Sequence, residues 1–231
     1  MKEKRGLIFF LVACAIFMVV NINSQYLIDA IEMLAYKPLQ GATIVLDAGH
    51  GGKDSGARAE KVFEKDLNLM ITLKCQKLLE KAGASVILTR DEDVDLSSDY
   101  ARNHKQEDMK NRMTLINNEK NDILISIHLN SYGNTSVKGA QSFYTKDNAA
   151  SLALAKSIQS YFKSELKSKM LPKPGDYYLL NETSIPGVLL ECGFLSNPSE
   201  RKLLQEKNYQ DKIAEAIFAG VLQYFNELNF D

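Results

Sequence analysis

The amino-acid sequence predicts an α/β fold: a single domain built on a mixed, mostly parallel sheet with helices on both faces. The first observation behind this prediction is that short apolar runs alternate along the chain with longer segments of helical periodicity. The second is that the apolar runs are nearly continuous, which is typical of strands buried on both faces. A chain of 231 residues that is 45% hydrophobic can bury one sizeable core.

The predicted elements follow one another in a regular order. Strands are expected at TIVLDAG (43–49), SVILTR (85–90), DILISIHLNS (122–131), GAQSFYT (139–145) and GVLLECGF (187–194). Helices are expected at residues 64–83, 109–120, 151–166 and 209–225. In the first helix the apolar residues fall on one stripe, and Gly83 ends the helix.

The N-terminus has the layout of an export signal. Basic residues at positions 2, 4 and 5 precede an apolar run over residues 7–20, and no small-residue cleavage site follows. We interpret residues 1–23 as a signal or membrane anchor, residues 24–41 as a connector and residues 42–231 as the main domain. A lipoprotein signal ending at Cys14 is disfavoured because the residues after it stay apolar. The main domain is expected outside the cytoplasm, anchored to the membrane or secreted.

Charge and cysteine content exclude several classes of protein. The net charge of -1 and pI of about 6.3 provide no positive field, so nucleic acid is not expected as a partner. The three cysteines contain no C-x-x-C pair, which argues against both a disulfide framework and a cysteine zinc site.

Residues able to do chemistry gather at the predicted strand ends. His50 follows the first strand within the glycine-rich stretch GHGG, His128 lies near the end of the third strand, and Glu191 lies in the fifth. Glu64 opens the helix that follows the glycine loop. Because ligands of open α/β sheets bind at the carboxyl ends of the strands, we expect these four side chains to share one crevice.

Two imidazoles and one carboxylate form a known catalytic zinc ligand set, and a second carboxylate beside it can move a proton during amide hydrolysis. Structural roles compete with this interpretation. His50 could be a hydrogen-bonded turn residue, His128 a core histidine, Glu64 a favourable charge at a helix N-terminus, and Glu191 half of a buried ion pair. A phosphate-binding loop is excluded, because GHGGKDSG matches neither nucleotide-binding glycine pattern.

Several long motifs together resemble the zinc-dependent N-acetylmuramoyl-L-alanine amidases of bacterial cell-wall turnover. They are IVLDAGHGGKDSGA, EKDLNL, GASVILTRDED, NRMTLIN, ISIHLNS, PGVLLECGFLSNPSE and KIAEAIFAGVLQYF, in the order and spacing of that family. The resemblance implies one zinc ion held by His50, Glu64 and His128, with Glu191 as the catalytic glutamate. It implies cleavage between N-acetylmuramic acid and L-alanine, with peptidoglycan glycan strands and stem peptides as partners.

The single domain behind an N-terminal membrane segment is most similar to the sporulation amidases of spore-forming bacteria. Those enzymes trim stem peptides during spore cortex maturation, leading toward muramic-δ-lactam, which implies the space between the forespore membranes as a location. Asn130 and Ser131, just after His128, could line the substrate groove. Arg112 could do so too, although a solvated position on a helix surface is the competing expectation. His104 is expected in an exposed loop.

Three alternatives stay open at this point. The same zinc ligand set would serve a peptidase that cuts within the stem peptide. A non-catalytic wall-binding regulator could keep the fold. The enzyme could also depend on an accessory protein, because the sequence shows no wall-binding repeat.

Overall fold

The computed structural model describes residues 37–118 and 120–228, and the described residues from Pro38 on form one compact unit. The expected signal or anchor segment and most of the connector lie outside the described residues. Within them, no helix combines the length and apolarity needed to cross a membrane.

The sheet has six strands in the order β4-β1-β5-β8-β6-β7. Their bounds are β1 Thr43–Ala48, β4 Ser85–Leu88, β5 Ile123–Asn130, β6 Gln141–Tyr144, β7 Lys173–Pro174 and β8 Gly187–Phe194. Strands β4, β1, β5 and β8 are mutually parallel, whereas β6 runs antiparallel to β8 and β7 pairs with β6. The predicted mixed, mostly parallel sheet is confirmed, and the carboxyl ends of β1, β5 and β8 meet at one edge.

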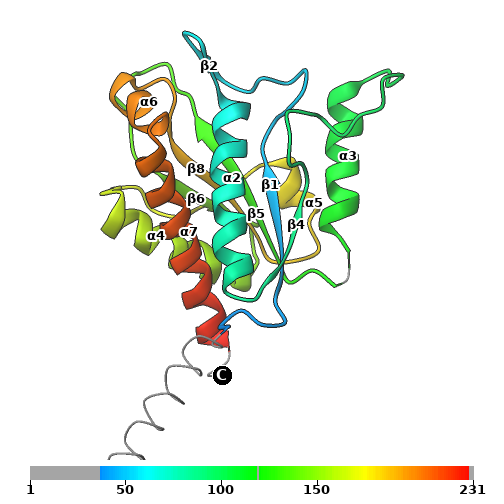
Figure 1. The fold of residues 1–231 in the computed structure, drawn as a ribbon, viewed down its shortest axis with the longest axis vertical. Helices are drawn as coiled ribbons and strands as arrows, with labels where there is room; N and C mark the ends of the chain where they lie inside the picture. The colour runs from blue at the N-terminus through cyan, green and yellow to red at the C-terminus, as the bar shows by residue number, and fades with distance from the viewer. Residues whose placement is uncertain (1–36, 119, 229–231) are drawn as a thin grey trace, which may run out of the picture. The chain divides into compact units, whose positions relative to one another are not determined.

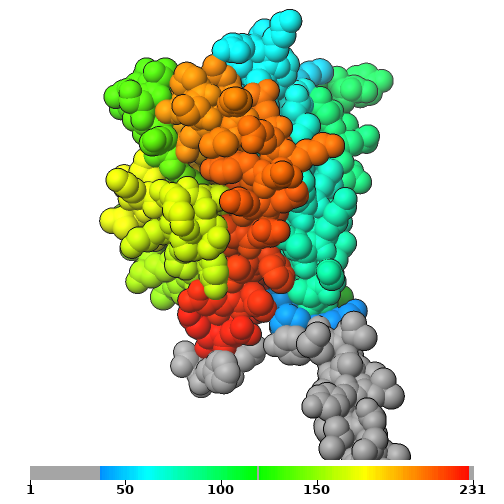
Figure 2. Space-filling model, turned by 60° about the vertical axis from the view of Figure 1, so that its left-hand side comes forward, coloured from blue at the N-terminus to red at the C-terminus, as the bar shows by residue number. Residues whose placement is uncertain are grey.

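Helices cover both faces of this sheet (Figure 1). On one face lie α2 (Glu64–Lys81), α4 (Ala149–Glu165) and α7 (Lys207–Leu228), and on the other lie α3 (His104–Ile116) and α5 (Tyr178–Glu182). Figure 2 shows α7 packed between α4 and α2. The short helix α6 (Pro198–Leu204) follows β8, and a hairpin of β2 (Arg58–Ala59) and β3 (Val62–Phe63) precedes α2.

Alternation along β1 explains why both faces need helices. Ile44 and Leu46 belong to the core cluster under α2, α4 and α7, whereas Val45 between them packs with Met113 of α3. Successive side chains of a strand point to opposite faces, so a strand that is buried along almost its whole length needs cover on both.

The start of α3 differs from the sequence prediction. The helix begins at His104 rather than near residue 109, because the side chain of Asn103 accepts a hydrogen bond from the backbone N–H of Gln106 at 3.2 Å and caps the helix. The expectation of an exposed loop at His104 is therefore wrong. His104 is half-buried in the first turn, where its Nδ1 lies 2.7 Å from the hydroxyl of Ser97.

Candidate metal centre and active site

Three side chains from separate elements converge at the carboxyl edge of the sheet. His50 follows β1, Glu64 is the first residue of α2, and His128 lies on β5. Each offers one donor atom, and these atoms lie within 4.8 Å of one another. Glu64 Oε1 is 3.2 Å from His50 Nε2 and 3.0 Å from His128 Nδ1.

Glycines create the space for this convergence. A side chain at Gly49 would place its Cβ 2.3 Å from the His128 ring. At Gly56 a Cβ would lie 2.6 Å from both Glu64 Oε2 and the His50 ring. Contacts this short cannot be accommodated, so only glycine at these two positions lets the donors approach one another. His50 itself adopts a left-handed backbone conformation with φ of 62°, which is uncommon for a residue other than glycine.

Glu64 is held as a carboxylate by a dense set of donors. Its Oε2 accepts the backbone N–H of Ala57 at 2.7 Å, and its Oε1 accepts those of Leu129 at 3.1 Å and of the Asn68 amide at 3.2 Å. Burial alone would raise the pKa of Glu64, but hydrogen bonds and charge from His128 and His50 bring it far below its usual range. Glu64 therefore stays ionised, as a metal ligand must.

The orientation of His50 is fixed by a carboxylate on its far side. Its Nδ1 lies 2.9 Å from Asp54 Oδ2, and Asp54 is paired in turn with Lys105. Because the Nδ1 hydrogen is donated to Asp54, Nε2 carries the lone pair that could bind a metal, and this atom faces Glu64. Carboxylates that orient ligating histidines in this way are a common feature of metal sites.

Glu191 lies beside the three donors but is held differently. It sits on β8 in register with His128 and is 7% exposed. Its Oε2 is buried without a hydrogen-bond partner. Burial raises the pKa of Glu191 to about 7, and the negative charge of Glu64 adds to this effect while the two histidines oppose it. Glu191 is thus a carboxyl poised between its two protonation states.

Arg112 lies under the site rather than on its surface. Its side chain has no exposed area. Nη1 donates to Asp47 at 2.6 Å and to the Ala48 carbonyl at 2.9 Å, Nη2 donates to the His50 carbonyl at 2.7 Å, and Nε donates to Asp108 at 3.0 Å. The expectation of a solvated helix surface is wrong, because the guanidinium is buried among these acceptors.

A second buried arginine, which the sequence reasoning missed, supports the same loop. Arg90 is 3% exposed and donates to the carbonyls of Ala48 at 2.9 Å, Gly49 at 3.0 Å and Lys65 at 2.8 Å. Three successive carbonyls, at residues 48, 49 and 50, are therefore fixed by two arginines. The position of Arg90 at the end of SVILTR could have indicated this role, because the end of β4 must lie beside the end of β1 once the two strands pair.

The remaining predicted site residues lie nearby. Asn130 ends β5 and is half-buried, and Ser131 follows it and is exposed. Tyr177, which the sequence reasoning did not single out, lines a cavity of about 160 Å³ together with His50 and His128. Burial raises the pKa of Tyr177 to about 12, with a contribution from the charges of Glu191 and Glu64.

The donor chemistry fits a metal ion. A His-Glu-His group is a known ligand set that leaves one position open, and the unpaired oxygen of Glu191 lies next to it. An α/β sheet that presents such a group beside an unpaired carboxyl is the arrangement of a metal-dependent hydrolase.

Comparison with known proteins defines the class further. The chain belongs to the N-acetylmuramoyl-L-alanine amidase family, whose model matches residues 44–223. A germination-specific N-acetylmuramoyl-L-alanine amidase of Bacillus subtilis is 41% identical over 195 residues, covering 82% of each chain. The predicted amidase family and its enzymatic activity are confirmed.

Solved structures agree with this assignment. The CwlD amidase from Clostridioides difficile, solved in complex with the GerS lipoprotein, is 44% identical with a TM-score of 0.78, covering 82% of this chain and all of that one. The catalytic domain of the amidase CwlV from Bacillus (Paenibacillus) polymyxa is 33% identical with a TM-score of 0.71, covering 80% of this chain and 98% of that one. The similarity to sporulation amidases that the sequence indicated is thus confirmed.

Proposed function

We propose that this amidase is a zinc enzyme in which His50, Glu64 and His128 hold one zinc ion. The support is their donor chemistry and the separation of at most 4.8 Å between donor atoms. The bond cleaved is the amide between the lactyl carboxyl of N-acetylmuramic acid and the amine of L-alanine.

Glu191 is the proton carrier in this proposal. When bound, zinc supplies Lewis-acid chemistry: it polarises the scissile carbonyl and makes a water molecule more acidic. Glu191 accepts a proton from the attacking water and returns it to the nitrogen of the departing L-alanine. A carboxyl whose pKa is raised by burial to about 7 can perform both transfers near neutral pH, whereas Glu64 is engaged as a proposed zinc ligand and accepts the N–H groups of Ala57 and Leu129.

Asn130 and Ser131 are proposed to line the substrate groove, because they continue β5 past His128 at the same edge of the sheet. Arg112 is assigned instead to positioning the carbonyl of His50, at a distance of 2.7 Å. This arrangement separates the residues that meet substrate from those that hold the loop in place.

The biological setting is proposed from the relatives. One relative is named as germination-specific, and one structural relative was solved with a lipoprotein partner. We propose that this chain acts in spore cortex maturation, on the path to muramic-δ-lactam, and works with an accessory protein. Residues 1–23 would export or anchor it, placing the domain of residues 42–231 outside the cytoplasm, in the forespore intermembrane space.

The observation that carries the mechanism is the unpaired Glu191 oxygen beside a complete three-donor group. The full-length chain, stripped with a chelator and then reloaded with zinc, would be incubated with purified peptidoglycan. Mass spectrometry should find released stem peptides with alanine at the N-terminus from the reloaded protein and none from the stripped protein. Cuts within the peptide would indicate a peptidase, and equal activity of the stripped protein would refute a metal requirement.

A further inference from the structure

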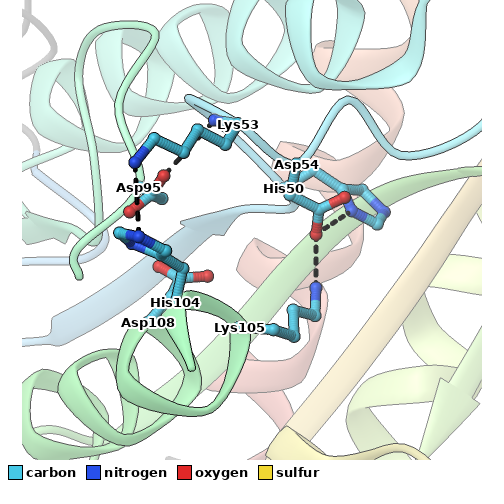
Figure 3. Close-up of a pocket in the computed structure, with 7 residues that line it drawn as sticks. All are labelled: His50, Lys53, Asp54, Asp95, His104, Lys105 and Asp108. Carbon is cyan, nitrogen blue, oxygen red and sulfur yellow. Dashed lines mark hydrogen bonds and ion pairs between the residues drawn. The ribbon is translucent and has the colours of Figure 1, made fainter. Parts of the chain in front are cut away.

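A cavity of about 410 Å³ adjoins the proposed metal centre on the side of His50. The loop after β1 and the first turn of α3 form its walls (Figure 3). It shares His50 and Asp54 with the metal centre, so a substrate whose scissile bond lies at the metal has neighbouring groups within reach of this cavity. Nothing in the mechanism above uses it.

Most charges around the cavity are already paired. Asp54 is paired with Lys105 and with His50, and Asp108 accepts the Nε–H of Arg112 at 3.0 Å. Asp95 accepts hydrogen bonds from the Ser97 hydroxyl, from the Ser97 N–H at 3.1 Å and from the Lys53 backbone N–H at 3.3 Å.

Lys53 differs from these groups. Its exposed side chain ends 3.3 Å from Nε2 of His104, and within the described residues its ammonium forms no ion pair with a carboxylate. The Ser97 hydroxyl donates its hydrogen to Asp95, so it can only accept from Nδ1–H of His104. In a neutral imidazole Nε2 then accepts one of the three ammonium hydrogens of Lys53. Two hydrogens remain for a ligand in the cavity.

The two halves of the substrate differ in the chemistry they offer to such a cation. The sugar half presents hydroxyls and acetamides, whereas the peptide half carries ionised carboxylates, which pair with an ammonium. We propose that Lys53, oriented by His104, binds a carboxylate of the stem peptide and so makes this cavity the peptide side of the active site. The inference rests on the amidase function proposed above.

The negative charge of Asp95, which lines the same cavity, sets the strength expected for this contact. Because a carboxylate stands near the cation, the cavity has no strong positive field, and recognition comes from direct contact between Lys53 and the peptide. Exposed ion pairs of this kind are worth about 1 kcal/mol or less. Removing Lys53 is accordingly expected to raise KM by up to about fivefold, with little change in kcat.

Matched substrates test the proposal with the zinc-loaded full-length chain. One is N-acetylmuramoyl-L-alanyl-D-glutamate with both carboxylates free, and the other is the same compound with both carboxylates converted to amides. The variants are Lys53→Gln, Lys53→Arg, which keeps the charge, and Lys156→Gln, which removes an exposed lysine from α4 as a control. Calorimetry would also measure binding of L-alanyl-D-glutamate and its diamide.

Lys53→Gln should raise KM about fivefold for the free carboxylates and less than about twofold for the diamide, while Lys53→Arg and Lys156→Gln resemble wild type. An equal loss on both substrates, or no loss on either, overturns the role of Lys53 and leaves the amidase function intact. If wild type cleaves neither compound, the proposed amidase function of this site is contradicted. The calorimetric contrast between peptide and diamide then decides the role of Lys53 alone.

Discussion

The loop after β1 and the strand β8 present neighbouring side chains to one crevice but hold them in opposite ways. His50 has its carbonyl fixed by Arg112, its ring fixed by Asp54, and a left-handed backbone with φ of 62°. Glu191 lies in a strand whose eight residues are all buried, and its Oε2 has no partner.

This difference follows from the tasks of the two residues. A metal ligand must keep one geometry and one protonation state, so hydrogen bonds that fix it do not slow turnover. A proton carrier must gain and lose a proton, and each hydrogen bond to its ionised form would lower its pKa and hinder the return step. Single substitutions can remove the fixed and the free parts of this arrangement separately.

The largest effect is expected from replacing the free carboxyl. Glu191→Gln preserves shape and burial but cannot accept a proton, so turnover should fall roughly 10³-fold. Bound zinc, measured by elemental analysis, should stay at the wild-type level because the three donors are unchanged. Glu182→Gln, an exposed glutamate at the end of α5, serves as the matched control. Wild-type turnover in Glu191→Gln would remove Glu191 from the mechanism.

The next effect concerns the support beneath His50. Arg112→Met keeps the side-chain bulk but leaves Asp47 and Asp108 buried without their cation, which should cost about 3 kcal/mol of unfolding free energy. Denaturant titration measures the loss, with Lys110→Met on the exposed side of α3 as the control. Equal stability of the two variants would show that the buried pairs do not support the loop.

A smaller effect is expected at the carboxylate behind His50. Asp54→Asn can still accept the Nδ1 hydrogen but loses the charge that holds the ring and pairs with Lys105, so zinc affinity should fall about 10- to 100-fold. Competition with a chromogenic chelator measures the affinity. The control is Asp211→Asn, which removes an exposed carboxylate of α7 that pairs with Lys74 of α2. An unchanged zinc affinity in Asp54→Asn would show that the charge of Asp54 is not needed to hold the His50 ring.

The sequence predicted the residues that face the crevice better than the buried residues that support them. His50, His128 and Glu191 were found because apolar strands show where the sheet ends, and a charged or titratable residue stands out in such a run. Arg112 was named but expected on a solvated surface or in the groove, because its pattern on α3 resembles that of a solvated residue. Its buried ion pair with Asp47 depends on how β1 and α3 pack in the folded protein. The sequence predicted a mixed sheet but not that β6 is the antiparallel strand, since direction depends on the connection rather than on hydrophobicity.

The smallest predicted effect is the pH dependence of the unfolding free energy that Asp47 causes. Burial alone would raise the pKa of Asp47, but the charge of Arg112, the charge of His128 and hydrogen bonds from Ser126 and Arg112 lower it to about 2. Because this folded-state value lies below the usual value of 3.8, the unfolded chain binds the proton more readily. The stabilisation is therefore complete above the unfolded pKa and is lost as the pH falls toward 2.

Between pH 5 and pH 3 the wild type should lose about 1 kcal/mol more unfolding free energy than Asp47→Asn, which has no proton to bind at this position. Denaturant titrations of both proteins at matched ionic strength measure the difference. Parallel pH curves would mean that Asp47 keeps its ordinary pKa in the folded protein. The ion pair with Arg112 would then not fix the loop that carries His50, and the contrast with β8 would reduce to burial alone.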